Sequence, residues 1–169
     1  MIAERIEALR AEMKKRNIDM YIIPTSDFHE SEYVGDYFKA RKYITGFTGS
    51  AGVAVVTMTE AGLWTDGRYF IQAEKQLAGT PVTLFKMGEE GVPTVREYVE
   101  KNLKEGACLG FDGRVINAAD GARYEEIVAK KNGSLYVTED LVGIIWKERP
   151  QLPMNPVYIL AVSYTHLRA

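Results

Sequence analysis

Two residue types that build many covalent and metal-bound sites are scarce in this sequence. Its 169 residues include one cysteine, Cys108, and two histidines. A single cysteine forms no disulfide within the chain, and Cys108 stands in an apolar stretch where we expect a small core side chain. Neither histidine stands in a spacing typical of zinc or calcium sites. The cysteine content favours a reducing, cytoplasmic location.

Large net charge and long apolar runs are absent too. The formal net charge is -2, which gives no support for nucleic acid or an anionic membrane as the main partner. No apolar run approaches the roughly 18 residues of a membrane span, and the charged, amphipathic N-terminus is unlike a signal peptide. Hydrophobic residues make up 46% and charged residues 26%, which predicts one globular domain of ordinary size.

The sequence does contain an alternation of helical and strand patterns. Ile2, Ile6, Leu9 and Met13 repeat at helical spacing, and this predicts a helix that stops near Asn17. We expect strands at residues 20–23, 53–56, 63–64, 82–85, 108–111 and 135–137, and helices after Asp66, after Thr94 and after Asn117 or Asp120. Residues 25–50 have no clean period, and we find no internal repeat. This order predicts an α/β fold with a mixed β-sheet flanked by helices.

The stretch Trp64-Thr65-Asp66-Gly67-Arg68-Tyr69 lies between a predicted strand and a predicted helix. Asp66 is the residue type that caps a helix N-terminus. Arg68 falls in the first turn, where the helix dipole disfavours a cation. We therefore expect Arg68 to meet a carboxylate, either inside the domain or across an interface. A second cap is predicted at Thr94, where Thr94 and Glu97 form a capping box.

No catalytic group follows from the residues alone. Asp27, His29, Glu30 and Glu32 are metal-ligand types within six residues, but their spacing favours a polar surface loop. The stretch Gly46-Phe47-Thr48-Gly49-Ser50-Ala51-Gly52 matches neither the dinucleotide-binding nor the P-loop pattern, so we expect its glycines to allow a tight turn. Ser50 lacks the glycine that a nucleophile elbow needs two residues before it.

Several segments together resemble a known family. They are Ser-Asp-x-His-x-Ser-Glu-Tyr at 26–33, Gly-Phe-x-Gly-Ser-Ala-Gly at 46–52, Trp-Thr-Asp-Gly-Arg-Tyr at 64–69, and residues 141–160. In this order they resemble the N-terminal domain of cytosolic-type Xaa-Pro aminopeptidases (aminopeptidase P), in the creatinase/prolidase superfamily. The resemblance covers about residues 4–160. It implies a ribonuclease-H-like arrangement for the sheet and its helices.

The resemblance also implies what lies outside this chain. Full-length members add a related middle domain and a C-terminal "pita-bread" domain. The latter holds two divalent metal ions, usually manganese, and removes an N-terminal residue that precedes proline. No catalytic residue, metal ligand or cofactor is thereby assigned to this chain. The family's first domain helps to form dimers and borders the substrate cleft. The matching positions expected near that cleft or interface are Asp66, Arg68, Tyr69, His29, Glu32 and Tyr33.

Proline marks the expected domain boundary. Three of the six prolines fall in residues 150–156. We expect residues 1–149 to form the domain and residues 150–160 a Pro-rich linker toward a middle domain. Residues 161–169 do not resemble the family's continuation, and we expect a non-native tail in which His166 carries no role.

Three other functions stay open on the sequence. The parent could be a catalytically inactive superfamily member that binds proteins or peptides. It could also be a prolidase or creatinase-type hydrolase built on the same scaffold. The third alternative is a small self-contained enzyme that uses the cluster around Asp27 and His29.

Overall fold

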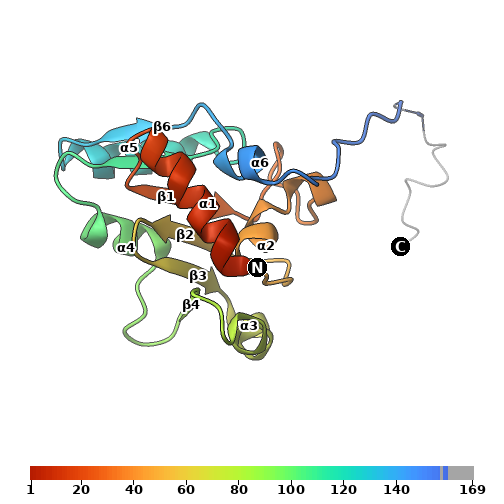
Figure 1. Ribbon diagram of the computed structural model, residues 1–169, viewed down its shortest axis with the longest axis horizontal. Coiled ribbons are helices and arrows are strands. Elements are labelled where there is room, and N and C mark those ends of the chain that lie inside the picture. Colours follow the sequence, from red (N-terminus) through yellow and green to blue (C-terminus); the bar gives the residue numbers. More distant parts are fainter. Residues whose placement is uncertain (157, 160–169) are drawn as a thin grey trace, which may run out of the picture.

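Six strands form one mixed sheet in the computed structural model, which describes residues 1–156, 158 and 159 (Figure 1). The strand order is β4-β3-β2-β1-β5-β6. The strands are β1 (Met20–Pro24), β2 (Val53–Thr57), β3 (Ala61–Thr65), β4 (Thr83–Lys86), β5 (Cys108–Phe111) and β6 (Ser134–Tyr136). Only β2 is antiparallel to its neighbours. The carboxyl ends of the other five strands and the amino end of β2 therefore share one edge of the sheet.

Helices cover both faces of this sheet (Figure 1). One core cluster contains side chains of α1 (Ile2–Lys15), α2 (Ala40–Thr45), α3 (Phe70–Leu77) and α6 (Leu141–Ile145). The other contains side chains of α4 (Val95–Asn102) and α5 (Ala118–Ala129). The predicted mixed sheet flanked by helices is confirmed.

Strand β1 shows how the sequence produces the two cores. Tyr21 and Ile23 belong to the cluster under α1, while Met20 and Ile22 belong to the cluster under α4 and α5. Successive side chains of a strand point to opposite faces, so a strand covered on both faces reads as a continuous apolar run. This is why residues 20–23 carry no hydrophobic–polar alternation.

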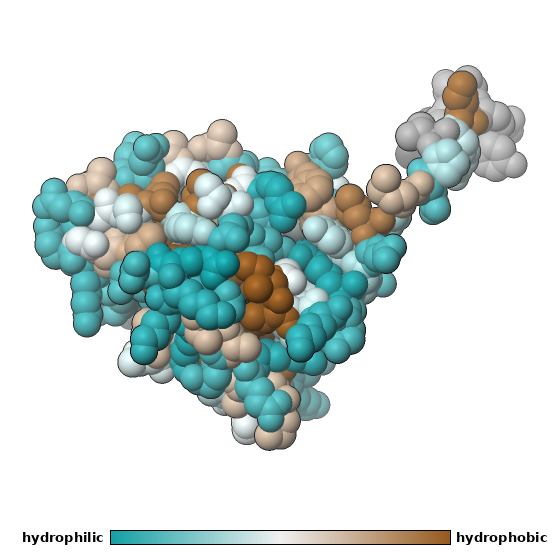
Figure 2. Space-filling view, turned by 45° about the horizontal axis from the view of Figure 1, so that its top comes forward, coloured by the Kyte–Doolittle hydropathy of each residue, from teal (hydrophilic) through white to brown (hydrophobic). Residues whose placement is uncertain are grey.

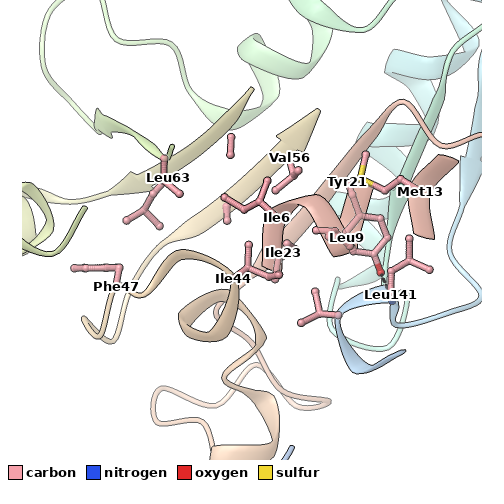
Figure 3. Packing of buried hydrophobic residues seen from close by; sticks show 14 of the residues in the cluster. Ile6, Leu9, Met13, Tyr21, Ile23, Ile44, Phe47, Val56, Leu63 and Leu141 are labelled. Carbon is pink, nitrogen blue, oxygen red and sulfur yellow. Dashed lines mark hydrogen bonds between the residues drawn. The ribbon is translucent and has the colours of Figure 1, made fainter. Parts of the chain in front are cut away.

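The core under α1 is visible in Figure 3. Ile6, Leu9 and Met13 of α1 are fully buried, as their helical spacing predicts, and they pack with Ile44 of α2 and Leu141 of α6. The predicted stop is also confirmed, because Asn17 adopts a positive φ of 55° just beyond the helix. One apolar stripe of α1 thus connects the two short helices to the sheet.

Four elements differ from the sequence prediction. Strand β3 spans Ala61–Thr65 rather than only 63–64, because Ala61 and Gly62 are also buried and paired with β2. Residues 25–50 contain the 3-10 helix η1 (Asp36–Phe38) and α2, and α6 follows β6. Cys108 is half-buried at the margin of a core cluster, since it begins β5 rather than lying in its middle.

The surface in Figure 2 is mostly hydrophilic, and a compact hydrophobic area lies near its centre. None of the helices among the described residues is both long and apolar enough to cross a bilayer. Residues 150–156, the first part of the predicted linker, have no helix or strand and extend away from the sheet (Figure 1). The predicted tail at 161–169 lies outside the described residues.

Candidate functional site

The residues predicted near a cleft come from loops at the shared edge of the sheet. The 25–39 loop follows β1, the 46–52 loop precedes β2, and the 66–69 turn follows β3. Buried Thr65, at the end of β3, donates its hydroxyl to the carbonyl of Ala51 at 2.8 Å and joins two of these loops. The topology therefore gathers sequence-distant segments into one region.

Asp66 and Arg68 form a two-point ion pair within this edge. Arg68 Nε donates to Asp66 Oδ1 and Nη2 donates to Oδ2, each at 2.9 Å. The Arg68 amide also donates to Asp66 Oδ1 at 3.1 Å, so Asp66 caps the turn as predicted. The capped element is the 3-10 helix η2 (Gly67–Tyr69), which leads into α3 at Phe70. The carboxylate expected for Arg68 is therefore inside the domain.

The charges of this pair act on each other. The Arg68 guanidinium lowers the pKa of Asp66 below its usual range. Asp66 in turn raises the pKa of Arg68, with smaller contributions from Tyr69 and Glu32. The Arg68 side chain stays 71% exposed, so its remaining N–H groups face solvent. The pair presents a fixed guanidinium edge on which an external acceptor can dock.

Tyr69 joins this turn to the 46–52 loop. Its hydroxyl and the Ser50 hydroxyl are hydrogen-bonded at 2.6 Å. Its ring meets the buried Phe47 ring edge-on, with the centroids 5.9 Å apart. The same loop needs glycine at 49, because a Cβ there would lie 2.2 Å from the Phe47 ring. The predicted structural role of these glycines is confirmed at this position.

A second ion pair of the same kind lies at the same edge, and it was not predicted from the sequence. Arg114 Nε donates to Asp112 Oδ1 at 3.0 Å and Nη2 donates to Oδ2 at 2.9 Å. The Arg114 amide also donates to Asp112 Oδ1 at 3.0 Å. Each pair follows the first strand of a β-α-β unit, β3-α3-β4 or β5-α5-β6. The signal is a repeated Leu-x-x-Asp-Gly-Arg, at 63–68 and 109–114, so the expectation that the sequence has no internal repeat was wrong for this short motif.

His29 lies in a short turn of the 25–39 loop. Asp27 Oδ1 accepts from the amides of His29 and Ser31, each at 2.9 Å, which closes a local turn. Glu30 instead accepts from Asn117 Nδ2 at 2.6 Å. In residues 1–156, 158 and 159, no group of three or more His, Cys, Asp or Glu side chains is placed to hold a metal ion. These carboxylates are engaged in loop structure, and we derive no step through a metal from them.

Glu32 and Tyr33 line a cavity of about 320 Å³. Thr48, Gly49 and Ser50 also line this cavity, together with Arg41 of α2. Tyr33 is 79% exposed, which is unusual for so large an aromatic side chain. Five of the six predicted residues thus lie close to one another at this edge, because Ser50 lines the cavity with Glu32 and Tyr33 and is hydrogen-bonded to Tyr69 in the turn of Asp66 and Arg68.

Comparison with known proteins explains why these segments occur in this order. Residues 5–149 match the model of the creatinase/prolidase N-terminal domain. This chain belongs to that family. The curated relatives of this creatinase/prolidase N-terminal domain include the probable Xaa-Pro aminopeptidases P of Paracoccidioides brasiliensis (strain Pb03) and Coprinopsis cinerea, which are 43% and 42% identical over 96% of the chain. The resemblance drawn from the sequence motifs is confirmed.

Solved structures give the same fold for this creatinase/prolidase N-terminal domain. X-prolyl aminopeptidase from Caenorhabditis elegans, described as a cytosolic enzyme with a di-nuclear active site, has 32% identity and a TM-score of 0.88. It matches 96% of this chain, which covers 28% of that protein. The N-terminal domain of a cytoplasmic peptidase from Mycobacterium tuberculosis has 26% identity and a TM-score of 0.60, with 85% of this chain and 98% of that one covered. The chain spans about a quarter of the length of the curated relatives.

Proposed function

We propose that this chain is the non-catalytic N-terminal domain of a longer, metal-dependent Xaa-Pro aminopeptidase. The parent removes the N-terminal residue that precedes proline, and it does so in the cytoplasm. Its catalytic domain holds two divalent metal ions, for which we propose manganese. The observation that carries the proposal is the match to relatives named Xaa-Pro aminopeptidase P along almost all of this chain but only a quarter of their length. The cytosolic, di-nuclear description of the worm protein supports location and metal number.

The contribution proposed for this domain is a surface rather than a reacting group. The edge that carries Asp66, Arg68, Tyr69, Glu32 and Tyr33 borders the substrate cleft or an interface with the catalytic domain or a second subunit. The exposure of Arg68 and Tyr33 supports this, because both offer unused binding capacity. Arginine and tyrosine are also enriched in the energetically important parts of protein interfaces.

Residues 150–160 are proposed to lead into the middle domain. Helix α6 precedes these residues, and the Arg149 side chain holds the backbone in place where the linker begins. Its Nε donates to the carbonyl of Tyr37 at 2.8 Å, and its guanidinium also pairs with Asp140. The linker therefore starts at a residue that is hydrogen-bonded to the 25–39 loop. Docking of a following domain would act on this loop through Arg149.

A peptidase assay on the full-length parent tests this function. With manganese present, we expect cleavage of Xaa-Pro-Xaa tripeptides at the bond before proline. Preference for Xaa-Pro dipeptides would instead indicate a prolidase. Turnover of creatine would indicate a creatinase-type parent. An inert parent that still binds peptides would support the binding-module alternative.

A further inference from the structure

The cavity beside Arg41 has a charge balance that the proposed accessory role does not use. It lies between the 25–39 loop and the turn at 48–50. Three basic side chains and one acidic side chain line it, namely Lys39, Arg41, Lys42 and Glu32. Lys39 pairs with Asp36, which is not part of the lining. The cavity wall therefore carries more positive charge than its own carboxylate offsets.

Arg41 is the most buried of these charges, with 3% of its surface exposed. Its Nε donates to Thr25 Oγ1 at 2.9 Å, its Nη1 donates to the Phe47 carbonyl at 2.6 Å, and its Nη2 donates to the Gly49 carbonyl. All three acceptors are uncharged. A guanidinium has five N–H groups, so two are left for a further acceptor.

The charge on Arg41 is fixed in place but not neutralised. Within the described part of the chain, neither Arg41 nor Lys42 forms an ion pair with a carboxylate. The Phe47 ring, 4.8 Å from the guanidinium carbon, offers only a cation–π contact. Burial lowers the pKa of Arg41 to about 10, so it is still a cation at neutral pH. A buried cation without an anion is costly, and a bound anion would relieve that cost.

Lys42 and the other walls indicate the kind of anion. Lys42 is exposed in the last turn of α2, one residue after Arg41, and its ammonium is free to move toward a ligand. Phe38, Val34 and Tyr33 supply apolar and aromatic surface, and Glu32 supplies one acceptor for a positive group. A volume of about 320 Å³ lies at the small end of ligand pockets. This combination suits a small organic anion that also carries an ammonium group.

We propose that this cavity binds the carboxylate of a free amino acid or of the C-terminus of a short peptide, with Arg41 and Lys42 as its cationic partners. Arg41 supplies the preorganised N–H donors, and Lys42 closes over the anion from the surface. This proposal does not depend on the parent being active. It gives the domain a ligand of its own.

Titration of this chain by nuclear magnetic resonance tests the proposal. The ligands are tri-alanine, tri-alanine amide, L-alanine and inorganic phosphate, each up to about 10 mM, which reaches millimolar dissociation constants. We expect saturable shifts of the Gly49 and Ser50 amides with tri-alanine or L-alanine. Tri-alanine amide should bind about tenfold more weakly than tri-alanine, as expected when a charge-assisted hydrogen bond is lost. If tri-alanine binds more strongly than L-alanine, the ligand is the C-terminus of a peptide. If L-alanine binds more strongly, the ligand is a free amino acid.

Two variants make the test specific. Lys42→Gln should weaken carboxylate binding about fivefold to tenfold, while Lys101→Gln, another exposed lysine in the last turn of a helix, should not change it. Arg41→Lys should abolish binding. Because this change in a buried residue can unfold the chain, the comparison of Lys42→Gln with Lys101→Gln decides the outcome. The proposal fails if neither tri-alanine nor L-alanine saturates, if the amide binds equally well, if phosphate alone binds, or if both lysine variants behave alike.

Discussion

The Arg68 guanidinium lies against the carboxylate of Asp66, two residues earlier, and Arg114 repeats this relationship with Asp112. In both pairs the carboxylate also caps the following backbone turn. The two arginines are therefore matched in local geometry. They differ in surroundings, because Arg114 lies over the Phe28 ring and near Asp140, whereas Arg68 lies near Tyr69 and Glu32. This pairing gives an internal control for the role of Arg68.

Arg68→Ala should leave the urea midpoint of this chain nearly unchanged, because exposed ion pairs contribute little to stability. In the full-length parent we expect kcat/KM or dimer affinity to fall about tenfold, as for the loss of one charge-assisted contact. Arg114→Ala is the control for function: it should leave kcat/KM and dimer affinity nearly unchanged, although it should lower stability more than Arg68→Ala, because its partner Asp112 is buried. Equal losses in stability and in activity would contradict a functional surface at Arg68.

Asp66→Ala should reduce the free energy of unfolding by about 1 kcal/mol, because it removes the cap of η2. Asp66→Asn keeps an oxygen that can accept from the Arg68 amide and should cost less. Urea denaturation of both variants measures the difference. If the alanine variant were as stable as the asparagine variant, the cap would not be contributing.

Tyr21→Phe should cost more, about 1–3 kcal/mol, because it leaves the buried Leu141 amide and the part-buried Glu139 carbonyl without a partner. The Tyr21 hydroxyl donates to the Glu139 carbonyl at 3.0 Å and accepts from the Leu141 amide at 3.1 Å, connecting β1 to the start of α6 (Figure 3). Tyr43→Phe is the control, since the Tyr43 hydroxyl makes a single 3.3 Å bond, to the Ile145 carbonyl. Calorimetric unfolding that ranks the two variants in the opposite order would refute the role assigned to Tyr21.

Acid should weaken the fold partly through Glu139. Arg16 donates to this carboxylate at 2.6 Å, and with a second bond from Tyr136 it lowers the Glu139 pKa from 4.5 to about 2. A lowered carboxyl pKa means that the stabilisation is present above pH 4.5 and is lost as the pH falls toward 2. Between these pH values, the unfolding free energy of the wild type should fall more steeply than that of Glu139→Gln. Parallel pH profiles would show that this pair does not contribute.

The sequence predicted the parts of the fold that depend on local chemistry. The apolar stripe of α1, the buried run of β1 and the capping box of Thr94 and Glu97 were all confirmed. These features depend on residues within one or two turns of each other, so a single sequence displays them. The predicted family followed from several such segments in a fixed order.

The missed elements lack that local signal. Helix α2 has six residues, and its three buried side chains are Arg41, Ile44 and Thr45, so hydrophobic spacing does not reveal it. Helix α6 has five residues with glycine at its centre, and its position depends on Tyr21, which is 120 residues away. The burial of Arg41 likewise depends on the Thr25 hydroxyl and the Gly49 carbonyl, which lie outside α2, and cannot be read from its neighbours in sequence.

The non-catalytic role of this domain is tested by comparing this chain with its full-length parent in one peptidase assay, on the same Xaa-Pro-Xaa peptide with manganese added. We expect the parent to cleave the peptide before proline and this chain alone to produce no cleavage above the buffer control. Metal-dependent cleavage by this chain alone would contradict it, and would return attention to Asp27, His29 and Glu32.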